Sequence, residues 1–579
     1  MKQLLPLTLL LLLLSHPTSA QQKKEQTGFD VTRNLEVFAD IYRQLDMFYV
    51  DTISADTAIQ WAINGMLQEI DPYTVYFPND DQDDLRRMAT GRYAGIGALI
   101  RAYKKLDRCV IEEPYEHCPA QESGVRAGDI IISIDGRDIK GWPTSRVSEN
   151  LRGEAGTTFE LIVQRPGETN QRSFKITRRQ IQQPCLPWYG IVDEASHTGY
   201  LLLTEFTDQS AREVRHAILD MKQQGMQRLI FDLRDNYGGS VSEAVEIVGF
   251  FVPRGTLVVS TKGKVPATCH DYQTPAEPID TVMPVAVLVN SNSASAAEIV
   301  SGALQDLDRA TILGQRTYGK GLVQGVREVS YRGQLKITTA RYYIPSGRCI
   351  QAYDFRHRTA EGAATTLPDS LTREFHTRQG RPVRDGGGIL PDSILAVDSV
   401  PTMVYDLFNS DTFFDYITSY VTRHPTAPQP GAFSLSDEDY AAFSDSIASS
   451  NFTYNGRTAA ALDQLRQLAR IEGRLEHASA EFDALEQKLK ENANSNCLQK
   501  RNRSLKTAEF LNATGTNRSI PGRQETKMMK FVFKPSSIIL VKKVMILFFC
   551  FLGLKELEKH TWALLSSVKP AVLLFRLKK

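Results

Sequence analysis

Residues 185–350 alternate between short apolar stretches and helical patterns, and this alternation restricts the fold more than any other feature of the chain. The stretches GYLLLTEF, RLIFDL, VAVLVN and RATILG have the length and apolar content of buried strands. The segments SAREVRHAILDMKQQG and VSEAVEIVGFF have helical spacing and lie between them. Alternation of this kind predicts an α/β unit with a largely parallel sheet.

Turns rich in glycine and serine follow two of the predicted strands. RDNYGGS comes after RLIFDL, and NSNSASA comes after VAVLVN and opens the next helical pattern. Because active sites in open α/β sheets lie at the carboxyl ends of strands, we expect a site where these two turns meet.

The rest of the chain divides by pattern. Residues 28–90 have helical spacing, residues 91–180 form a β-rich module of alternating strands and Asp-Gly turns, and residues 185–400 make the α/β core with a loop-rich end. Residues 401–496 return to helical patterns. Their run ALDQLRQLARIEGRLEHASAEFDALEQKLK predicts one long helix or a coiled-coil element.

The chain begins like an exported protein. Residues 1–20 combine Lys2, an apolar run from Leu4 to Leu14 and a small-residue cleavage site at Thr18-Ser19-Ala20. This pattern predicts a signal peptide, and the less favoured alternative is a retained membrane anchor. We therefore expect export to a periplasm or to the outside.

The last stretch, residues 497–579, differs from the rest in charge. It carries 17 Lys and Arg against 4 Glu and no Asp, whereas the whole chain has a net charge of +1. One interpretation is a basic tail that lies on a membrane surface. The favoured interpretation is an end that did not evolve as a folding segment, from a frameshift or read-through, and we expect it to be disordered.

Cysteine and histidine usage excludes some classes of site. Seven cysteines are too few for a disulfide scaffold, although Cys109 and Cys118 are close enough in sequence to pair across two strands. The ten histidines show no metal-ligand spacing. We expect no metal, no cofactor and no nucleic-acid partner.

Three serines, Ser291, Ser293 and Ser295, lie in the turn after VAVLVN, and serine is a nucleophile only when a base takes its proton. No histidine lies between this turn and residue 350, so lysine is the other candidate base. Lys336 is in an alternating strand and is expected to face solvent, whereas Lys320 lies between glycines in TYGKGLVQG. A desolvated lysine with a lowered pKa could serve as that base.

The stretch NSNSASAAEIVSGALQDLDRATILGQRTYGKGLVQ resembles the signature of the C-terminal processing (tail-specific) serine peptidases, S41 type. The resemblance implies that Ser295 is the nucleophile, that Lys320, 25 residues later, is the base, and that Gln324 orients it. Ala297 departs from the family pattern at a position without a catalytic role. A serine at this place, taken alone, is more often a helix N-cap than a nucleophile.

The resemblance extends over roughly residues 30–400 and implies a multidomain α/β fold. Its parts would be a crotonase- or ClpP-like peptidase core, an inserted PDZ domain and helical segments at both ends. The oxyanion hole would use backbone N–H groups of Ala296 and of the Gly238-Gly239 turn. In the PDZ domain, Gly95, Ile96 and Gly97 would hold the C-terminal carboxylate of a bound peptide.

We therefore expect an exported serine endopeptidase that recognises protein substrates by exposed C-termini and forms a homodimer through its helical ends. The alternatives are a PDZ-based scaffold with weak or vestigial chemistry, and a peptidase that its PDZ domain holds inactive until a ligand binds.

Overall fold

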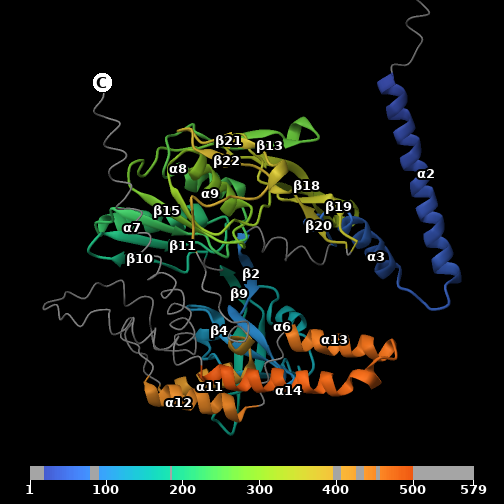
Figure 1. Ribbon diagram of the computed structural model, residues 1–579, viewed down its shortest axis with the longest axis vertical. Helices are drawn as coiled ribbons and strands as arrows, with labels where there is room; N and C mark the ends of the chain where they lie inside the picture. The colour runs from blue at the N-terminus through green and yellow to red at the C-terminus, as the bar shows by residue number, and fades with distance from the viewer. Residues whose placement is uncertain are drawn as a thin grey trace, which may run out of the picture.

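The computed structural model describes residues 19–78, 90–182, 185–360, 362–395, 406–424, 436–450 and 457–499. All but the last two residues of the predicted signal peptide, and all but the first three of the predicted basic tail, lie outside these ranges. Figure 1 shows an upper body, a lower body and a long helix that stands apart from both.

A six-stranded sheet lies at the centre of the upper body. Its order is β10-β11-β12-β15-β16-β23, and all neighbours are parallel except β10 and β11. The α/β unit expected from the alternating pattern is therefore present. The strands are β10 (Trp188–Asp193), β11 (Thr198–Leu202), β12 (Arg228–Asp232), β15 (Val285–Val289), β16 (Thr311–Gly314) and β23 (Ser393–Ile394).

Three helices, α7 (Ser210–Gln223), α8 (Val241–Gly249) and α9 (Ala296–Asp306), pack in one layer against this sheet, and α8 and α9 also contact a second, antiparallel sheet. One hydrophobic cluster joins all three layers. The strands of the second sheet are β1 (Val75–Phe77), β13 (Leu257–Gly263), β14 (His270–Gln273), β17 (Leu322–Glu328) and β18 (Gln334–Tyr343). Two hairpins complete the loop-rich end, formed by β19 (Tyr353–Arg358), β20 (Ala364–Thr366), β21 (Glu374–His376) and β22 (Pro382–Arg384).

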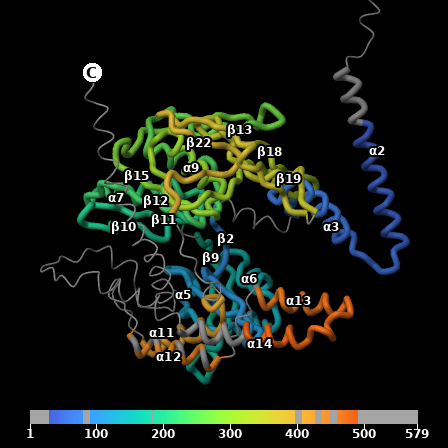
Figure 2. The backbone as a smooth tube through the Cα atoms, viewed as in Figure 1, coloured from blue at the N-terminus to red at the C-terminus, as the bar shows by residue number. Residues whose placement is uncertain are grey.

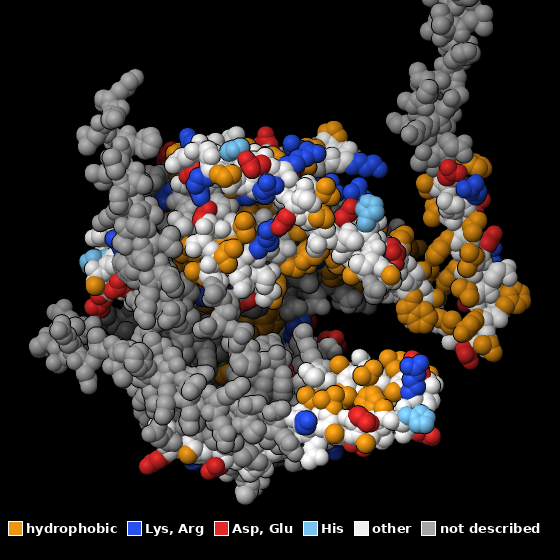
Figure 3. All heavy atoms as spheres, viewed as in Figure 1, with side chains coloured by type: hydrophobic (Ala, Val, Ile, Leu, Met, Phe, Trp, Pro, Cys, Tyr) orange, Lys and Arg blue, Asp and Glu red, His pale blue; other side chains and the backbone are white. Residues whose placement is uncertain are grey.

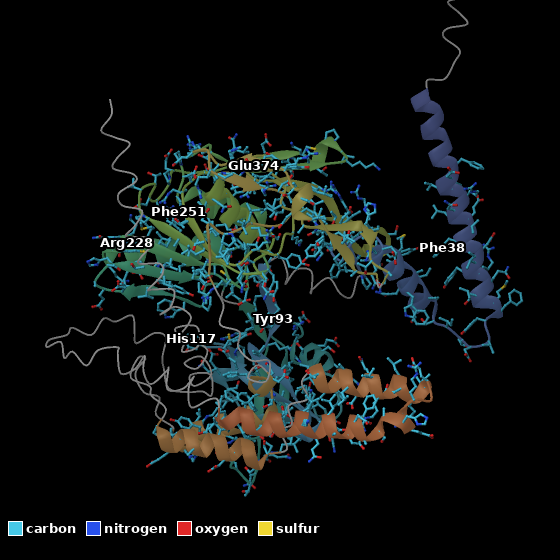
Figure 4. The ribbon with its side chains drawn as sticks, in the orientation of Figure 1. Phe38, Tyr93, His117, Arg228, Phe251 and Glu374 are labelled. Atoms are coloured by element: carbon cyan, nitrogen blue, oxygen red, sulfur yellow. The ribbon has the colours of Figure 1, made fainter. Side chains whose placement is uncertain are left out.

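The β-rich module forms a separate sheet with its own core in the lower body. The module begins with β2 (Arg92–Gly95) and ends with β9 (Arg179–Gln182), and these two strands pair with each other. The module is therefore an insertion whose two connections to the core lie side by side, and we call this strand pair the neck. Tyr93 marks this neck in Figure 4. The other elements are β3 (Ala98–Tyr103), β4 (Arg108–Pro114), α5 (Pro119–Glu122), β5 (Ile130–Ile134), β6 (Arg137–Asp138), α6 (Thr144–Leu151), β7 (Thr158–Gln164) and β8 (Gln171–Thr177).

Helices α11 (Asp411–Arg423) and α12 (Asp437–Ser449) pack on the inserted module rather than on the α/β core. Phe413 and Ile417 are buried in one cluster with Val110 of β4 and Ile130 of β5. Figure 2 shows the same association of the C-terminal helices with the module. The C-terminal segment therefore stabilises the inserted module.

Of the two alternatives for this segment, one long helix or a coiled-coil element, the single long helix is wrong. The structure has two helices, α13 (Arg457–Ile471) and α14 (Leu475–Gln499), that contact each other as a hairpin. The break lies at Gly473, whose φ of 69° belongs to the left-handed region that ends helices.

The N-terminal helix α2 (Ser19–Phe48) projects from the body, and α3 (Ala55–Gln68) follows it (Figure 1). Hydrophobic side chains cover part of the surface of α2 in Figure 3, and one of the exposed ones, Phe38, is labelled in Figure 4. Within the ranges that the structure describes, no helix is both long enough and apolar enough to span a bilayer.

The pairing considered for Cys109 and Cys118 is absent, because both are free thiols. Cys109 lies in β4 within the core of the module and approaches the Thr144 hydroxyl. Cys118 packs instead against Gly97 in the loop between β2 and β3. The two side chains therefore have different surroundings.

Candidate active site

The two turns singled out in the sequence meet at the carboxyl ends of β12 and β15, which are parallel neighbours. Hydrogen bonds join the turns along their length: the Ala294 N–H donates to the Asn236 carbonyl at 2.9 Å, and the buried Ser293 hydroxyl donates to the Leu233 carbonyl at 2.7 Å. Ser291 is exposed. Ser293 therefore braces the loop, and Ser295 is the serine at the helix end.

Ser295 precedes the first residue of α9 and has an unusual backbone, with φ 55° and ψ −115°. A non-glycine residue there costs about 1–3 kcal/mol, and such strain is concentrated at functional sites. The half-buried side chain lies at the N-terminus of a buried helix, where the dipole favours negative charge. The location suits an oxygen nucleophile and a developing oxyanion.

Gly238 packs directly against this serine. A Cβ at Gly238 would lie 2.7 Å from the Ser295 Cβ and 2.9 Å from the Ala296 nitrogen, so no larger residue fits. The Gly238 N–H donates to the Asn236 Oδ1 at 2.8 Å. Its neighbour Gly239 forms a bridge with Phe206. Of the three expected oxyanion donors, Gly238 is therefore already engaged by a side chain.

A buried carboxylate links the Ser295 turn to the loop that carries Lys320. Glu298 is fully buried, and its Oε2 accepts hydrogen bonds from the backbone N–H groups of Ser295 and Lys320, both at 2.9 Å. Its Oε1 accepts from the Gly319 N–H at 2.7 Å and from the Thr317 hydroxyl at 2.6 Å. Burial raises the pKa of Glu298 to about 6, although these donors favour its charged form.

Tyr342 of β18 links the same two loops from the other side. The ring is buried, and its hydroxyl lies within hydrogen-bond distance of the Lys320 carbonyl and 3.3 Å from the Ser295 carbonyl. Glu298 and Tyr342 thus each link the backbone of Ser295 to the backbone of Lys320.

The Lys320 side chain is half-buried, and burial lowers the pKa of its amine to about 8. The nearby charge of Lys336 lowers this pKa further, whereas Glu298 and Asp71 oppose the shift. At pH 7 roughly a tenth of such an amine is neutral. This fraction can act as a base.

Lys336 was expected to face solvent, and this expectation is wrong. Its side chain is half-buried, and its amine lies 5.9 Å from the centre of the Phe77 ring. Strand β1 pairs with β18 at this residue and covers it, which alternation within β18 alone could not reveal. Lys336 consequently acts on the pKa of Lys320.

The described residues contain no hydrogen bond between the Ser295 hydroxyl and the Lys320 amine. The amine lies instead 4.5 Å from the centre of the Tyr73 ring. Gln324 follows a bulge in β17, and its amide donates to the Thr338 hydroxyl at 3.1 Å rather than contacting Lys320. The three residues are neighbours in the fold but are not bonded into one chain.

The three residues expected to bind a peptide carboxylate lie together in the inserted module. Gly95 ends β2, Ile96 is buried, and Gly97 has a φ of 68°. Cys118 packs against Gly97 so tightly that a Cβ there would lie 2.4 Å from the Cys118 Cβ. The loop is therefore closely supported from one side.

Three residues that contact the site were not assigned a role in the sequence. Glu298 could have been found, because it stands three residues after an N-cap serine, the spacing of a capping box. No sequence pattern around Tyr342 or Tyr73 indicated that these residues contact the site. Across the described part of the chain, no cluster of three or more His, Cys, Asp or Glu side chains is arranged to hold a metal ion.

Three segments match models of protein families. Residues 197–357 match peptidase family S41, residues 110–165 match a PDZ domain, and residues 403–508 match the C-terminal helical domain of a probable PDZ-protease. These segments correspond to the core, the inserted module and the helices that pack on it.

Curated relatives are similar over the same region. A carboxy-terminal-processing protease of Bartonella bacilliformis is 34% identical over 55% of this chain and 73% of its own length. A probable CtpA-like serine protease of Staphylococcus aureus is 32% identical over 55% of this chain and 62% of its own. The solved photosystem II D1 C-terminal processing protease is 27% identical, covering 65% of this chain and 97% of its own, with a TM-score of 0.34.

We expect Glu298→Gln to loosen both loops, because an amide supplies one acceptor oxygen and turns an NH2 group toward donors. The free energy of unfolding of the core should fall by about 2–4 kcal/mol. Amide hydrogen exchange at Gly319 and Lys320 should quicken at least tenfold. Glu328→Gln, at an exposed end of β17, is the control, and equal behaviour of the two variants would contradict the structural role given to Glu298.

Proposed function

The chain belongs to peptidase family S41, and we propose that it cleaves protein substrates with a Ser295–Lys320 dyad. It is a serine-type C-terminal processing peptidase with a PDZ domain. One observation carries the proposed dyad: the buried Glu298 carboxylate binds the backbone of a strained serine and the backbone of a desolvated lysine.

The proposed reaction needs a neutral lysine. The Lys320 amine takes the proton of the Ser295 hydroxyl while the serine oxygen attacks the carbonyl carbon of the scissile peptide bond. The Ala296 N–H, with an N–H of the Gly238-Gly239 turn, stabilises the oxyanion. The ammonium then protonates the leaving nitrogen. Water, deprotonated by the same amine, releases the acyl group and restores the serine.

Three changes are needed before this chemistry can begin. The Lys320 amine has to leave the Tyr73 ring and reach Ser295, and Gln324 has to turn from Thr338 toward the lysine. The Gly238 N–H has to leave the Asn236 Oδ1 before it can contribute to the oxyanion hole. These three contacts favour the second candidate function, a PDZ-containing binding protein whose peptidase activity is regulated.

We propose that the PDZ domain captures the substrate C-terminus through the backbone of Gly95, Ile96 and Gly97. The left-handed Gly97 and the close support from Cys118 fit a loop whose backbone N–H groups bind an anion. The peptide would extend the sheet beside β3. We also propose a crotonase- or ClpP-like core, supported by a parallel sheet that helices cover on one face.

We propose a homodimer formed through the helical ends of the chain. Phe38, Ile41, Leu45 and Phe48 make an apolar stripe on α2, and their exposed fractions are 46%, 56%, 47% and 73%. Each buried side chain of this type contributes about 1.5–3 kcal/mol to association. The identical stripe of a second copy is the occupant that we propose.

Export and membrane association rest on sequence alone. The pattern of residues 1–20 supports export to the periplasm, and the basic tail supports contact with an anionic membrane surface on that side.

We expect Ser295→Ala and Lys320→Met to abolish cleavage, with a loss of at least about 10³-fold in kcat/KM while the fold survives. Lys336→Met should retain activity and move the acid limb of the pH profile upward, because it removes a charge that lowers the pKa of Lys320. Cleavage assays between pH 6 and 10 distinguish the three variants. Activity in the Lys320→Met protein would exclude the dyad.

Recognition of the C-terminus can be tested with one unstructured protein substrate that ends either in a free carboxylate or in an amide. We expect amidation of its apolar C-terminus to lower kcat/KM at least tenfold. Gly97→Ala should have the same effect, because a Cβ there meets Cys118. Gly136→Ala is the matched control, since Gly136 has a similar φ of 72° and open space around it. Equal cleavage of both forms would argue against capture of the C-terminus.

Light scattering tests the oligomeric state. The intact chain should have the mass of two copies, and Ile41→Asp with Leu45→Asp should yield one copy. Val282→Asp, at a loop residue that is 86% exposed, should remain a dimer. A wild-type monomer at micromolar concentration would refute the proposed dimer.

A further inference from the structure

An aromatic cluster lies beside the amine of Lys320. Tyr73 and Phe355 meet edge to face with ring centres 5.8 Å apart, Tyr353 lies 6.2 Å from Phe355, and Tyr318 lies 5.2 Å from Tyr353. These four rings come from a segment before β1, from the loop of the lysine itself and from β19. Among them, Tyr73 lies over the lysine amine.

The distance from the Lys320 nitrogen to the Tyr73 ring centre is 4.5 Å, which is the range of a cation–π contact. Such a contact attracts the ammonium form and has little hold on a neutral amine. It therefore opposes the proton acceptance that a base must perform. It also occupies the amine at a place where no hydrogen bond to Ser295 forms among the described residues.

Tyr73 is itself held firmly. The Asp71 carboxylate accepts from the N–H groups of Tyr73 at 2.8 Å and of Thr74 at 2.7 Å, in a segment that leads directly into β1. The Tyr73 hydroxyl donates to the Tyr318 hydroxyl at 3.4 Å. The backbone N–H of Tyr318 in turn donates to the Ser293 carbonyl at 3.0 Å. Tyr318 therefore connects the Tyr73 ring to the loop that carries Ser295.

We propose that Tyr73 is a positioning residue that holds the Lys320 ammonium away from Ser295 in the resting enzyme. The inference rests on the proposed role of Lys320 as the base. Loss of the proton ends the attraction, so the neutral amine is released toward the serine hydroxyl. Tyr73 contacts the base and not the substrate, and its effect passes entirely through the lysine.

Other charged groups also influence the pKa of Lys320, and a substitution at Tyr73 would leave them in place. Lys336 of β18 disfavours the ammonium, whereas Glu298 of α9 and Asp71 favour it. Burial raises the pKa of the Tyr73 hydroxyl well above its usual value, so this hydroxyl stays neutral over the working range. The ring face is thus the part of Tyr73 that acts on the lysine charge.

The test is the pH profile of kcat/KM, which reports the ionisation of the free enzyme. Tyr73→Leu keeps an apolar cover and removes the ring, so the acid limb should shift downward by about one pH unit. Cleavage at pH 6.5 should rise about tenfold, with an unchanged plateau above pH 9. Tyr73→Phe keeps the ring and should match the wild type, and Tyr73→Met should repeat the result of Tyr73→Leu.

Tyr76→Leu is the control, because Tyr76 lies in the adjacent strand β1 and packs near Gly333. A lower plateau without a shifted limb in Tyr73→Leu and Tyr73→Met would show a merely structural role and overturn the inference. So would an unshifted limb in both variants, or the same shift in Tyr73→Phe. The assignment of the base fails separately, by activity in Lys320→Met.

Discussion

The arrangement of this site depends on one buried carboxylate. Glu298 has no access to water and receives four hydrogen bonds, two of them from the backbone of Ser295 and the backbone of Lys320. A buried charge is tolerated when its oxygens are satisfied, and here the donors are the loops that must be aligned. The buried charge of Glu298 thereby sets the spacing between the backbone of Ser295 and the backbone of Lys320.

The lysine experiences opposing influences. Burial and Lys336 favour the neutral amine that a base requires, whereas Glu298, Asp71 and the Tyr73 ring favour the ammonium. Burial, Lys336, Glu298 and Asp71 together leave the pKa of Lys320 at about 8, close enough to neutrality for modest rearrangements to change the fraction of neutral amine.

The inserted module and the C-terminal helices form a second structural unit. Phe413 and Ile417 are buried against Val110 and Ile130, and Arg101 pairs with Asp411 at 2.7 Å. The unit joins the core through the paired strands β2 and β9. Any movement of the module relative to the core is therefore expected to carry α11 and α12 with it.

Patterns local in the sequence predicted local structure well. The alternation in residues 185–350 gave the parallel sheet, and the turns after β12 and β15 met as expected because parallel strands end at one edge. Contacts between distant segments could not be predicted. Tyr73 precedes Lys320 by 247 residues, and β1, which pairs with β18 at Lys336, is similarly distant in the sequence. The sequence also did not indicate that α11 packs on the inserted module. Neither the bulge before Gln324 nor its hydrogen bond to Thr338 had a signal in the sequence.

The rate at which a serine-directed fluorophosphonate labels the protein tests the activation of Ser295 by Lys320 most directly, since it needs no substrate recognition. Mass spectrometry should locate the label on Ser295, with a rate that rises with pH through an apparent pKa of about 8. The rate should be lost in Lys320→Met. Label on another serine, or an unchanged pH–rate curve without the lysine, would contradict the dyad.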